Sequence, residues 1–351
     1  KSLNAITNFL YNVLAYITNI VNNYGVSIII FTFLMRLICM PFDYRSRKGM
    51  RKMTLLQPEL DKLQKKYGND KQKFQQKQAE LMRREHYNPL SGCLPLLLTW
   101  PLMIAMFAAM RAIANEQLAL QVFRYLAGEA EVVMPADRFL WIKNIWMTDS
   151  PFASIAPDAQ SLQLLSRDVW QKACAMLSDA QLSAAAQTLS VESTLDALRN
   201  CFESDAAMKA SVATLVNALG QIESYQAAVA TVPGWSGLNF FLFSVSLYQN
   251  YNGLLILPIL AGVSQILTTK LMPQQQQQPQ ADSQQKGMNG FMKWFFPILS
   301  IYFCLSSNAG FAIYWVTSNV VAGVQSVVIN KMLEHQDKKK QKTVSGEGSV
   351  K

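Results

Sequence analysis

Long apolar runs separated by polar segments form the main pattern along this chain. The first, YGVSIIIFTFLMRLICMPF at residues 24–42, is long enough to cross a bilayer as a helix, which needs about 20 residues. It carries one internal charge, Arg36. The runs predict five transmembrane helices, at residues 24–43, 88–113, 251–272, 290–307 and 308–330. The predicted fold class is therefore an all-α integral membrane protein.

The segment before the first span has a different pattern. Residues 1–23 place apolar side chains at helical spacing, but four asparagines interrupt the run. This pattern favours an amphipathic helix that lies in the membrane interface. A transmembrane helix over the same residues is the alternative.

Residues 44–87 are polar and strongly basic. Thirteen Lys and Arg face five acidic residues, and Tyr67-Gly68-Asn69-Asp70 has the composition of a turn between two helical stretches. The segment is predicted to form a helical hairpin in water. A solvated charged loop without a function is the alternative.

A long polar region, residues 114–250, separates the second and third spans. Within it, residues 155–232 are rich in Ala, Ser, Gln and Leu and predict an insert of several short helices. Five apolar residues before the insert are predicted to form a group at the membrane interface: Phe139, Trp141, Ile142, Ile145 and Trp146. Residues 273–289, with five consecutive glutamines, predict a flexible connector, and residues 331–351 form a basic tail.

The distribution of charge predicts the orientation of the chain. The net charge is +9, with half of the residues hydrophobic and only 16% charged. The hairpin, the connector with its flanking Lys270 and Lys293, and the tail together hold 22 basic and 9 acidic residues, whereas residues 112–250 hold 7 basic and 13 acidic ones. By the positive-inside rule, the first group lies in the cytoplasm. Residues 1–23 and 114–250 are then predicted to lie outside.

Arg36 is the residue in the spans that most needs an explanation. A charge inside an apolar helix costs at least about 2.5 kcal/mol, unless it reaches water or a partner. The apolar runs contain no Asp or Glu to neutralise it, which favours a water-filled indentation open to the cytoplasm. Snorkelling of the side chain to the headgroups is the alternative. Other spans supply polar residues that could line such a groove: Gln265, Trp315, Ser318 and Asn319. The alternative is that Ser318, Asn319 and Gln325 only form hydrogen bonds between helices, and that Trp315 lies at the interface, in the core or against lipid.

The sequence offers little for catalysis. Its two histidines, His86 and His335, lie in polar segments, and it has no HExxH, GxSxG or phosphate-binding glycine loop. We predict that the protein is not an enzyme and has no catalytic residue, metal or cofactor. The cysteines form no CxxC motif. Cys174 and Cys201 are either a disulfide pair or two separate thiols.

Several motifs, in order, resemble the YidC insertase family, which has mitochondrial and chloroplast relatives. They are QPELDKLQKKYGND after the first span, NPLSGCLPLLLTWP in the second, FLWIKNI after it, and YWVTSN in the last. Together with the first span, they cover the five spans and the hairpin. The segment between FLWI and the third span is longer than is usual in this family, and the large N-terminal domain of many members is not present in these residues.

The resemblance implies a five-helix core around a hydrophilic groove that opens to the cytoplasm and to lipid. The groove arginine of the family matches Arg36, the polar position of the third span matches Gln265, and the tryptophan of the YW pair matches Trp315. It also implies residence in the bacterial plasma membrane. The implied partners are nascent membrane proteins, the ribosome, the Sec translocon and membrane lipids.

The predicted function is that of a membrane protein insertase or chaperone that works without nucleotide hydrolysis. An alternative is a small-solute transporter that uses the same polar cavity, although the sequence lacks the internal repeat that many transporters show. A second alternative is an assembly chaperone that folds membrane proteins without inserting them.

Overall fold

The computed structural model describes residues 2–68, 70–85, 90–240, 243–271 and 283–347. The described chain is helical, apart from one short antiparallel ribbon. It divides into two compact units that are each made of three segments. Unit 1 holds residues 1–31, 105–261 and 300–315, and unit 2 holds residues 32–104, 262–299 and 316–351.

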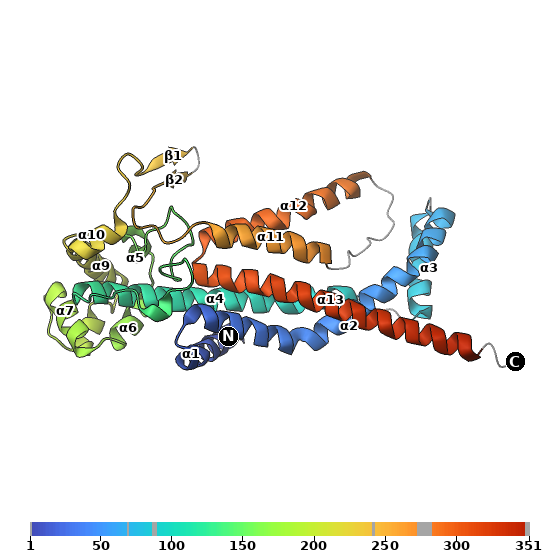
Figure 1. The fold of residues 1–351 in the computed structure, drawn as a ribbon, viewed down its shortest axis with the longest axis horizontal. Helices are drawn as coiled ribbons and strands as arrows, with labels where there is room; N and C mark the ends of the chain where they lie inside the picture. Colours follow the sequence, from blue (N-terminus) through green and yellow to red (C-terminus); the bar gives the residue numbers. More distant parts are fainter. Residues whose placement is uncertain (1, 69, 86–89, 241–242, 272–282, 348–351) are drawn as a thin grey trace. The chain divides into compact units, whose positions relative to one another are not determined.

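Seven helices carry the apolar runs, the N-terminal amphipathic segment and the basic hairpin. They are α1 (Ser2–Val21), α2 (Tyr24–Tyr67), α3 (Lys71–Arg84), α4 (Leu90–Leu126), α11 (Ile256–Leu271), α12 (Ser283–Ser306) and α13 (Ala309–Glu347). Helix α13 ends the described chain (Figure 1).

The region between α4 and α11 contains short elements. They are η1 (Pro135–Asp137), α5 (Ala159–Gln163), α6 (Arg167–Ala175), α7 (Asp179–Leu189), α8 (Leu195–Asn200), α9 (Asp205–Leu219), α10 (Glu223–Val229), β1 (Leu238–Phe240) and β2 (Phe243–Val245).

Several helices continue past the limits expected from the apolar runs. Helix α2 continues without a break from the first apolar run into the basic hairpin, and α13 runs on through most of the basic tail. Helix α4 extends to Leu126, because the residues after the apolar run pack their own apolar face into the core of unit 1. Most of the predicted glutamine connector lies outside the described residues, and residues 283–289 already belong to α12.

Two described helices are long and apolar enough to cross a membrane, α2 and α13. Shorter apolar helices are found at Ala5–Val21, Ile256–Leu271 and Trp294–Ser306. Helix α11 has 16 residues and is therefore about 24 Å long, less than the hydrocarbon thickness. These properties fit an α-helical membrane protein, and the number of spans stays a prediction.

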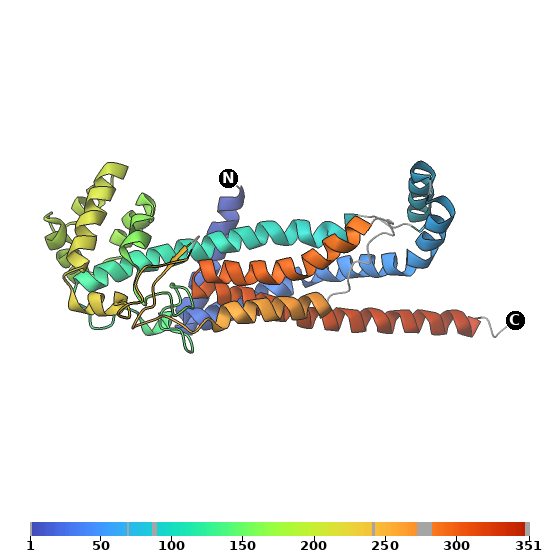
Figure 2. The same cartoon turned by 90° about the horizontal axis from the view of Figure 1, so that it is seen from above.

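The insert is a folded helical domain around the end of α4. Figures 1 and 2 show α5 to α10 gathered about this end. Trp170 is fully buried there; its ring stacks on Phe202 at a centroid distance of 5.5 Å and meets Phe123 edge-on at 6.0 Å. Such aromatic pairs add about 0.5–1.5 kcal/mol each beyond the area they bury. The aromatic core therefore fixes the insert on α4.

One buried carboxylate also joins the insert to α1. Glu116 of α4 is 3% exposed and accepts hydrogen bonds from the Tyr11 hydroxyl at 2.6 Å and from the Lys172 ammonium at 2.9 Å. Tyr11 belongs to α1 and Lys172 to α6. An ionised group at this depth needs such partners, so the contact links three elements of unit 1.

The two cysteines of the insert are free thiols in the structure. Cys174 is buried and Cys201 is half-buried. Burial raises the pKa of the Cys174 thiol to about 12, and the nearby Cys201 adds to the shift. The structure thus favours two separate thiols over a disulfide.

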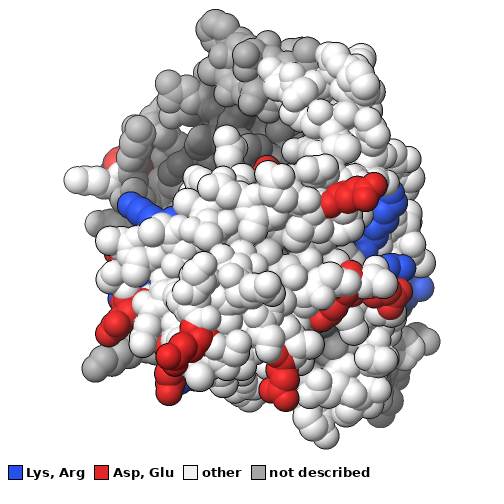
Figure 3. Space-filling view, turned by 90° about the vertical axis from the view of Figure 1, so that its left-hand side faces the viewer, with Lys and Arg blue, Asp and Glu red and all other residues white. Residues whose placement is uncertain are grey.

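The surface of the insert carries an excess of acidic side chains. Figure 3 looks onto this end of unit 1, where Asp and Glu are scattered over a mostly neutral face and Lys and Arg gather near its edges. This distribution follows from the 13 acidic and 7 basic residues of positions 112–250.

A loop at residues 134–155, here called the junction loop, holds several helix ends of unit 1 together. Its Ile145 and Met147 carbonyls accept hydrogen bonds from the first backbone N–H groups of α13, at 2.9 and 2.8 Å. Its Asp149 carboxylate accepts from the backbone N–H groups of Leu254 and Leu257 at the start of α11. Helix starts have unpaired N–H groups, and the loop supplies their acceptors.

The structure corrects three of the five residues of the interfacial group predicted in this loop, whereas Phe139 and Trp141 are half-buried. Ile142, Ile145 and Trp146 are buried inside unit 1, each at 2% exposed or less. The Trp146 indole donates a hydrogen bond to the buried Asp137 carboxylate at 2.8 Å. A run rich in aromatic residues near the end of a span can lie in the headgroup layer or in a protein core. In this loop, long-range packing places these three residues in the core.

Candidate functional site

Arg36 lies on α2 and reaches a hydroxyl of α13. Its Nε and Nη2 atoms donate hydrogen bonds to Ser318 Oγ at 3.1 and 2.6 Å. The side chain is half-buried, and within the described residues it forms no salt bridge. The side-chain hydrogen bonds of this cation therefore go to a neutral hydroxyl.

A second contact joins the same two helices. Gln325 lies seven residues after Ser318, which places both on one face of α13. Its Nε2 donates a hydrogen bond to the backbone carbonyl of Arg36 at 2.9 Å. Pro41, five residues further along α2, has no N–H, so the Leu37 carbonyl next to that of Arg36 lacks its usual helical donor.

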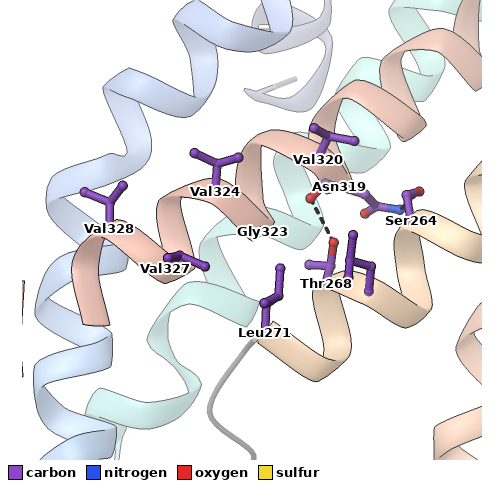
Figure 4. Close-up of a pocket in the computed structure, with 10 residues that line it drawn as sticks. Ser264, Thr268, Leu271, Asn319, Val320, Gly323, Val324, Val327 and Val328 are labelled. Carbon is purple, nitrogen blue, oxygen red and sulfur yellow. Dashed lines mark hydrogen bonds between the residues drawn. The ribbon is translucent and has the colours of Figure 1, made fainter. Parts of the chain in front are cut away.

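Asn319 continues the polar contacts from α13 to α11. Its Nδ2 donates to Ser264 Oγ at 3.2 Å, and its backbone carbonyl accepts from Thr268 Oγ1 at 2.8 Å (Figure 4). Gln265, the residue predicted from α11, is half-buried beside Ser264. Ser264 and Thr268, one helical turn apart, make the contacts to α13.

The structure adds Arg47 to the candidate site, a residue that the sequence alone did not single out. It was counted among the solvated basic residues of the hairpin, but it is only 7% exposed and donates a hydrogen bond to Ser326 Oγ of α13. Ser326 in turn donates to the Leu271 carbonyl at the end of α11, at 2.7 Å. Burial lowers the pKa of Arg47, and the nearby Asp43 opposes this shift.

The spacing along α2 contained a signal for this residue. Arg36 and Arg47 are 11 residues apart, which is close to three helical turns, so they share one face. Asp43 lies on the same side and interacts electrostatically with both. Asp43 lies directly after the apolar run, which ends at Phe42, so the run taken alone leaves Arg36 without a carboxylate.

We call this set of residues in unit 2 the polar seam. Its members are Arg36, Arg47, Ser264, Thr268, Ser318, Asn319, Gln325 and Ser326.

A pocket of about 280 Å³ opens beside the polar seam, between α11 and α13. Ser264, Thr268 and Asn319 lie at one end (Figure 4). The remaining wall is apolar and consists of Leu267, Leu271, Val320, Gly323, Val324, Val327 and Val328. The pocket therefore places hydrogen-bonding groups at one end of an apolar surface.

Trp315, another predicted groove residue, belongs to unit 1. Its ring centroid lies 5.6 Å from that of Phe311 and 6.3 Å from that of Phe303. Its indole Nε1 is buried and has no hydrogen-bond acceptor among the described residues. Ser318 follows it by one turn of α13.

The polar seam consists of hydroxyl, amide and guanidinium groups. These groups can bind anions and polar backbone, and they supply no general base beside a nucleophile. Among the residues that the structure describes, no group of three His, Cys, Asp or Glu is placed to hold a metal ion.

The helical architecture and the apolar helices are those of an α-helical membrane protein, and the polar seam links its helices by hydrogen bonds. The model of the family described as 60Kd inner membrane protein matches residues 16–190 and 197–338. The chain belongs to this family, which is that of the YidC insertases.

Curated relatives agree with this assignment. The chain is 34% identical over 161 residues to "Membrane protein insertase YidC" of Clostridium tetani, which covers 45% of this chain and 65% of the relative. It is 43% identical over 111 residues to the protein of the same name from Fusobacterium nucleatum, covering 30% and 54%. It is 35% identical over 140 residues to the protein of this name from Anaeromyxobacter dehalogenans, and the match covers 40% of this chain and 22% of the relative. The chain thus spans less than two thirds of each of these relatives.

Proposed function

We propose that the protein is a membrane protein insertase that receives apolar segments of nascent proteins and releases them into lipid without nucleotide hydrolysis. The names of its relatives, which are membrane protein insertases, support this activity. The observation that carries the proposal is the environment of the Arg36 guanidinium, which is half-buried and donates hydrogen bonds to Ser318. A guanidinium in an apolar helix, held by a serine hydroxyl and a half-buried environment, is available to an anionic group of a client.

The proposed topology has five transmembrane helices around a hydrophilic groove that opens to the cytoplasm. The groove comprises Arg36, Gln265, Trp315, Ser318 and Asn319. The hairpin, the connector and the basic tail lie in the cytoplasm, and residues 1–23 and 114–250 lie outside. The count of basic residues supports this arrangement.

The first step of the proposed mechanism is an exchange of hydrogen-bond partners. A client carboxylate replaces the Ser318 hydroxyl at the Arg36 guanidinium. A hydrogen bond between two ionised groups is roughly twice as strong as one between neutral groups, so the exchange favours the client. The polar groups of α11 and α13 then form hydrogen bonds with the polar part of the client as it passes.

The second step is lateral release along α11 and α13. The pocket wall carries exposed valines and leucines, with Leu267, Val320 and Val324 each more than half exposed. An apolar client helix moves from this wall into lipid, and burial at about 25 cal/mol per Å² drives the step. The proposed partners are nascent chains, the ribosome at the basic hairpin and tail, the Sec translocon and anionic lipids.

Site-specific crosslinking in proteoliposomes tests the proposal. The purified protein, with a photo-crosslinking residue in place of Val324, is supplied with a ribosome-bound single-span client that has an acidic translocated tail. We expect insertion of the client and a crosslink to it. The same probe at Leu164, which is 83% exposed on the insert, is the control and gives no crosslink during cytoplasmic entry. Solute flux without client insertion would instead support a transporter.

Gly323→Leu should block the pocket. A Cβ atom at Gly323 would lie 3.4 Å from Leu271 Cδ1 and 3.6 Å from Thr268 Oγ1, so a methyl group fits and a larger side chain fills the space. We expect Gly323→Leu to lower the Val324 crosslink yield by about tenfold if it removes one contact of about 1.4 kcal/mol. Gly323→Ala is the matched control and should keep most of the yield. Equal yields from both variants would exclude the pocket from the client path.

A further inference from the structure

Three exposed apolar side chains stand on separate segments at the junction loop. Leu140 is 76% exposed, Phe152 is 47% exposed and Leu254 is 50% exposed. Leu140 and Phe152 belong to the junction loop, and Leu254 precedes the first residue of α11 by two positions. We call these three side chains the apolar tip. In water, such a group of exposed apolar residues would be unfavourable.

Buried polar contacts hold the three segments of the apolar tip together. The Asp149 Oδ1 atom accepts a hydrogen bond from the Trp141 indole at 3.2 Å and one from the Leu254 backbone N–H at 2.8 Å. Asp149 itself is fully buried. The Phe152 N–H donates to Ser150 Oγ at 3.1 Å. The residues next to each exposed side chain are therefore anchored at one point.

The backbone of the apolar tip is strained in a way that keeps Leu140 exposed. Leu140 has a φ of 51° at a tight turn between Phe139 and Ile142, which pair in an antiparallel bridge. Asn and Gly are preferred at such positions, and a leucine there is strained. Leu255, beside Leu254, has a φ of 64°. Transfer of the Leu140 side chain into an apolar phase is favourable and opposes this strain.

Two observations indicate that the apolar tip contacts lipid and not a protein partner. The tip is continuous with the apolar helix α11, which begins at Ile256. Lys143 lies with its Nζ 5.0 Å from the ring centroid of Tyr251, and a lysine beside an aromatic ring suits the headgroup layer. A stable protein interface buries about 800 Å² on each partner, more than three side chains on three segments provide.

We propose that the apolar tip inserts into the membrane interface at the end of α11 and anchors the junction loop there. The lipid acyl chains surround Leu140, Phe152 and Leu254, and the Lys143 ammonium reaches the phosphate layer. This contact goes beyond the proposed insertase activity and does not depend on it, because it requires only that α11 lies in the bilayer.

Spin labels in lipid vesicles test the proposal. In a variant whose native cysteines are replaced, Leu140→Cys and Leu254→Cys are labelled with a nitroxide, and the protein is reconstituted at a low protein-to-lipid ratio. We expect relaxation by oxygen to exceed relaxation by a water-soluble nickel chelate at both positions. Leu164→Cys on the insert is the control, with the opposite order.

Two outcomes would overturn the anchor. Labels at both tip positions that relax like the Leu164 control would place the apolar tip in water. Labels that are immobilised and protected from both reagents would place it against protein, such as a second copy. Leu140→Gly separates anchoring from folding. It relieves the left-handed strain, so it should not lower the unfolding temperature. It also removes one anchoring side chain, so the label at position 254 should lie less deeply in the bilayer.

Discussion

Replacing Arg36 with alanine is expected to lower the insertion of a client with an acidic translocated tail by about tenfold or more. A hydrogen bond to a charged group contributes about 1.5–3 kcal/mol, and 1.4 kcal/mol corresponds to a factor of ten. Arg36→Lys keeps the charge and should retain most of the insertion. Protease protection of the client tail in proteoliposomes measures the effect.

Two controls separate attraction of the client from a general loss of fold. A client with a neutral tail should insert nearly equally into vesicles with either Arg36 variant, because no carboxylate is involved. Ser318→Ala removes the neutral partner of Arg36 but keeps the charge, and should retain insertion of the acidic client. If wild type, Arg36→Ala and Arg36→Lys all insert the acidic client equally, Arg36 does not attract clients.

Asp149→Ala is expected to destabilise the protein by about 3 kcal/mol or more, since an unpaired buried hydrogen-bonding group costs about 1–3 kcal/mol. The change leaves three donors without their acceptor: the Trp141 indole and the backbone N–H groups of Leu254 and Leu257. The drop in unfolding temperature in detergent, followed by circular dichroism, measures it.

The matched control for this change is Asp158→Ala. Asp158 also accepts a backbone hydrogen bond at a helix start, from the Ser161 N–H at 2.7 Å, but it serves only the short helix α5. Loss of such a cap costs about 1 kcal/mol. A larger effect from Asp158→Ala than from Asp149→Ala would contradict the role of Asp149 as the acceptor that fixes the start of α11.

Helical periodicity and hydropathy were enough to predict part of the candidate site. Arg36 and Ser318 were both chosen as polar residues within apolar helices, and the structure joins them directly. The choice between Gln265 and Ser264 was harder, because neighbours on a helix differ by about 100° in direction. Only the packing of α11 on α13 shows that Ser264 faces Asn319.

Long-range packing explains what the sequence could not predict. Arg47 has the composition and neighbours of a solvated hairpin residue, and its burial depends on Ser326, 279 residues away. The buried aromatic residues of the junction loop pose the same problem, since a headgroup layer and a protein core select the same side chains. The glycine at position 253 is explained only by the structure, because a Cβ there would overlap the Asp149 carboxylate.

The position of the junction loop in the sequence has a consequence for biosynthesis. Its acceptors at residues 145–149 are translated before α11 and α13, and they accept hydrogen bonds from backbone N–H groups at the starts of these two helices. Asp149 and Leu257 are 108 residues apart, and closing a flexible loop of that length is entropically costly. The folded insert removes most of this cost, because its two ends meet in the bridge between Ser154 and Tyr251. The starts of α11 and α13 thus meet acceptors that have already been synthesised.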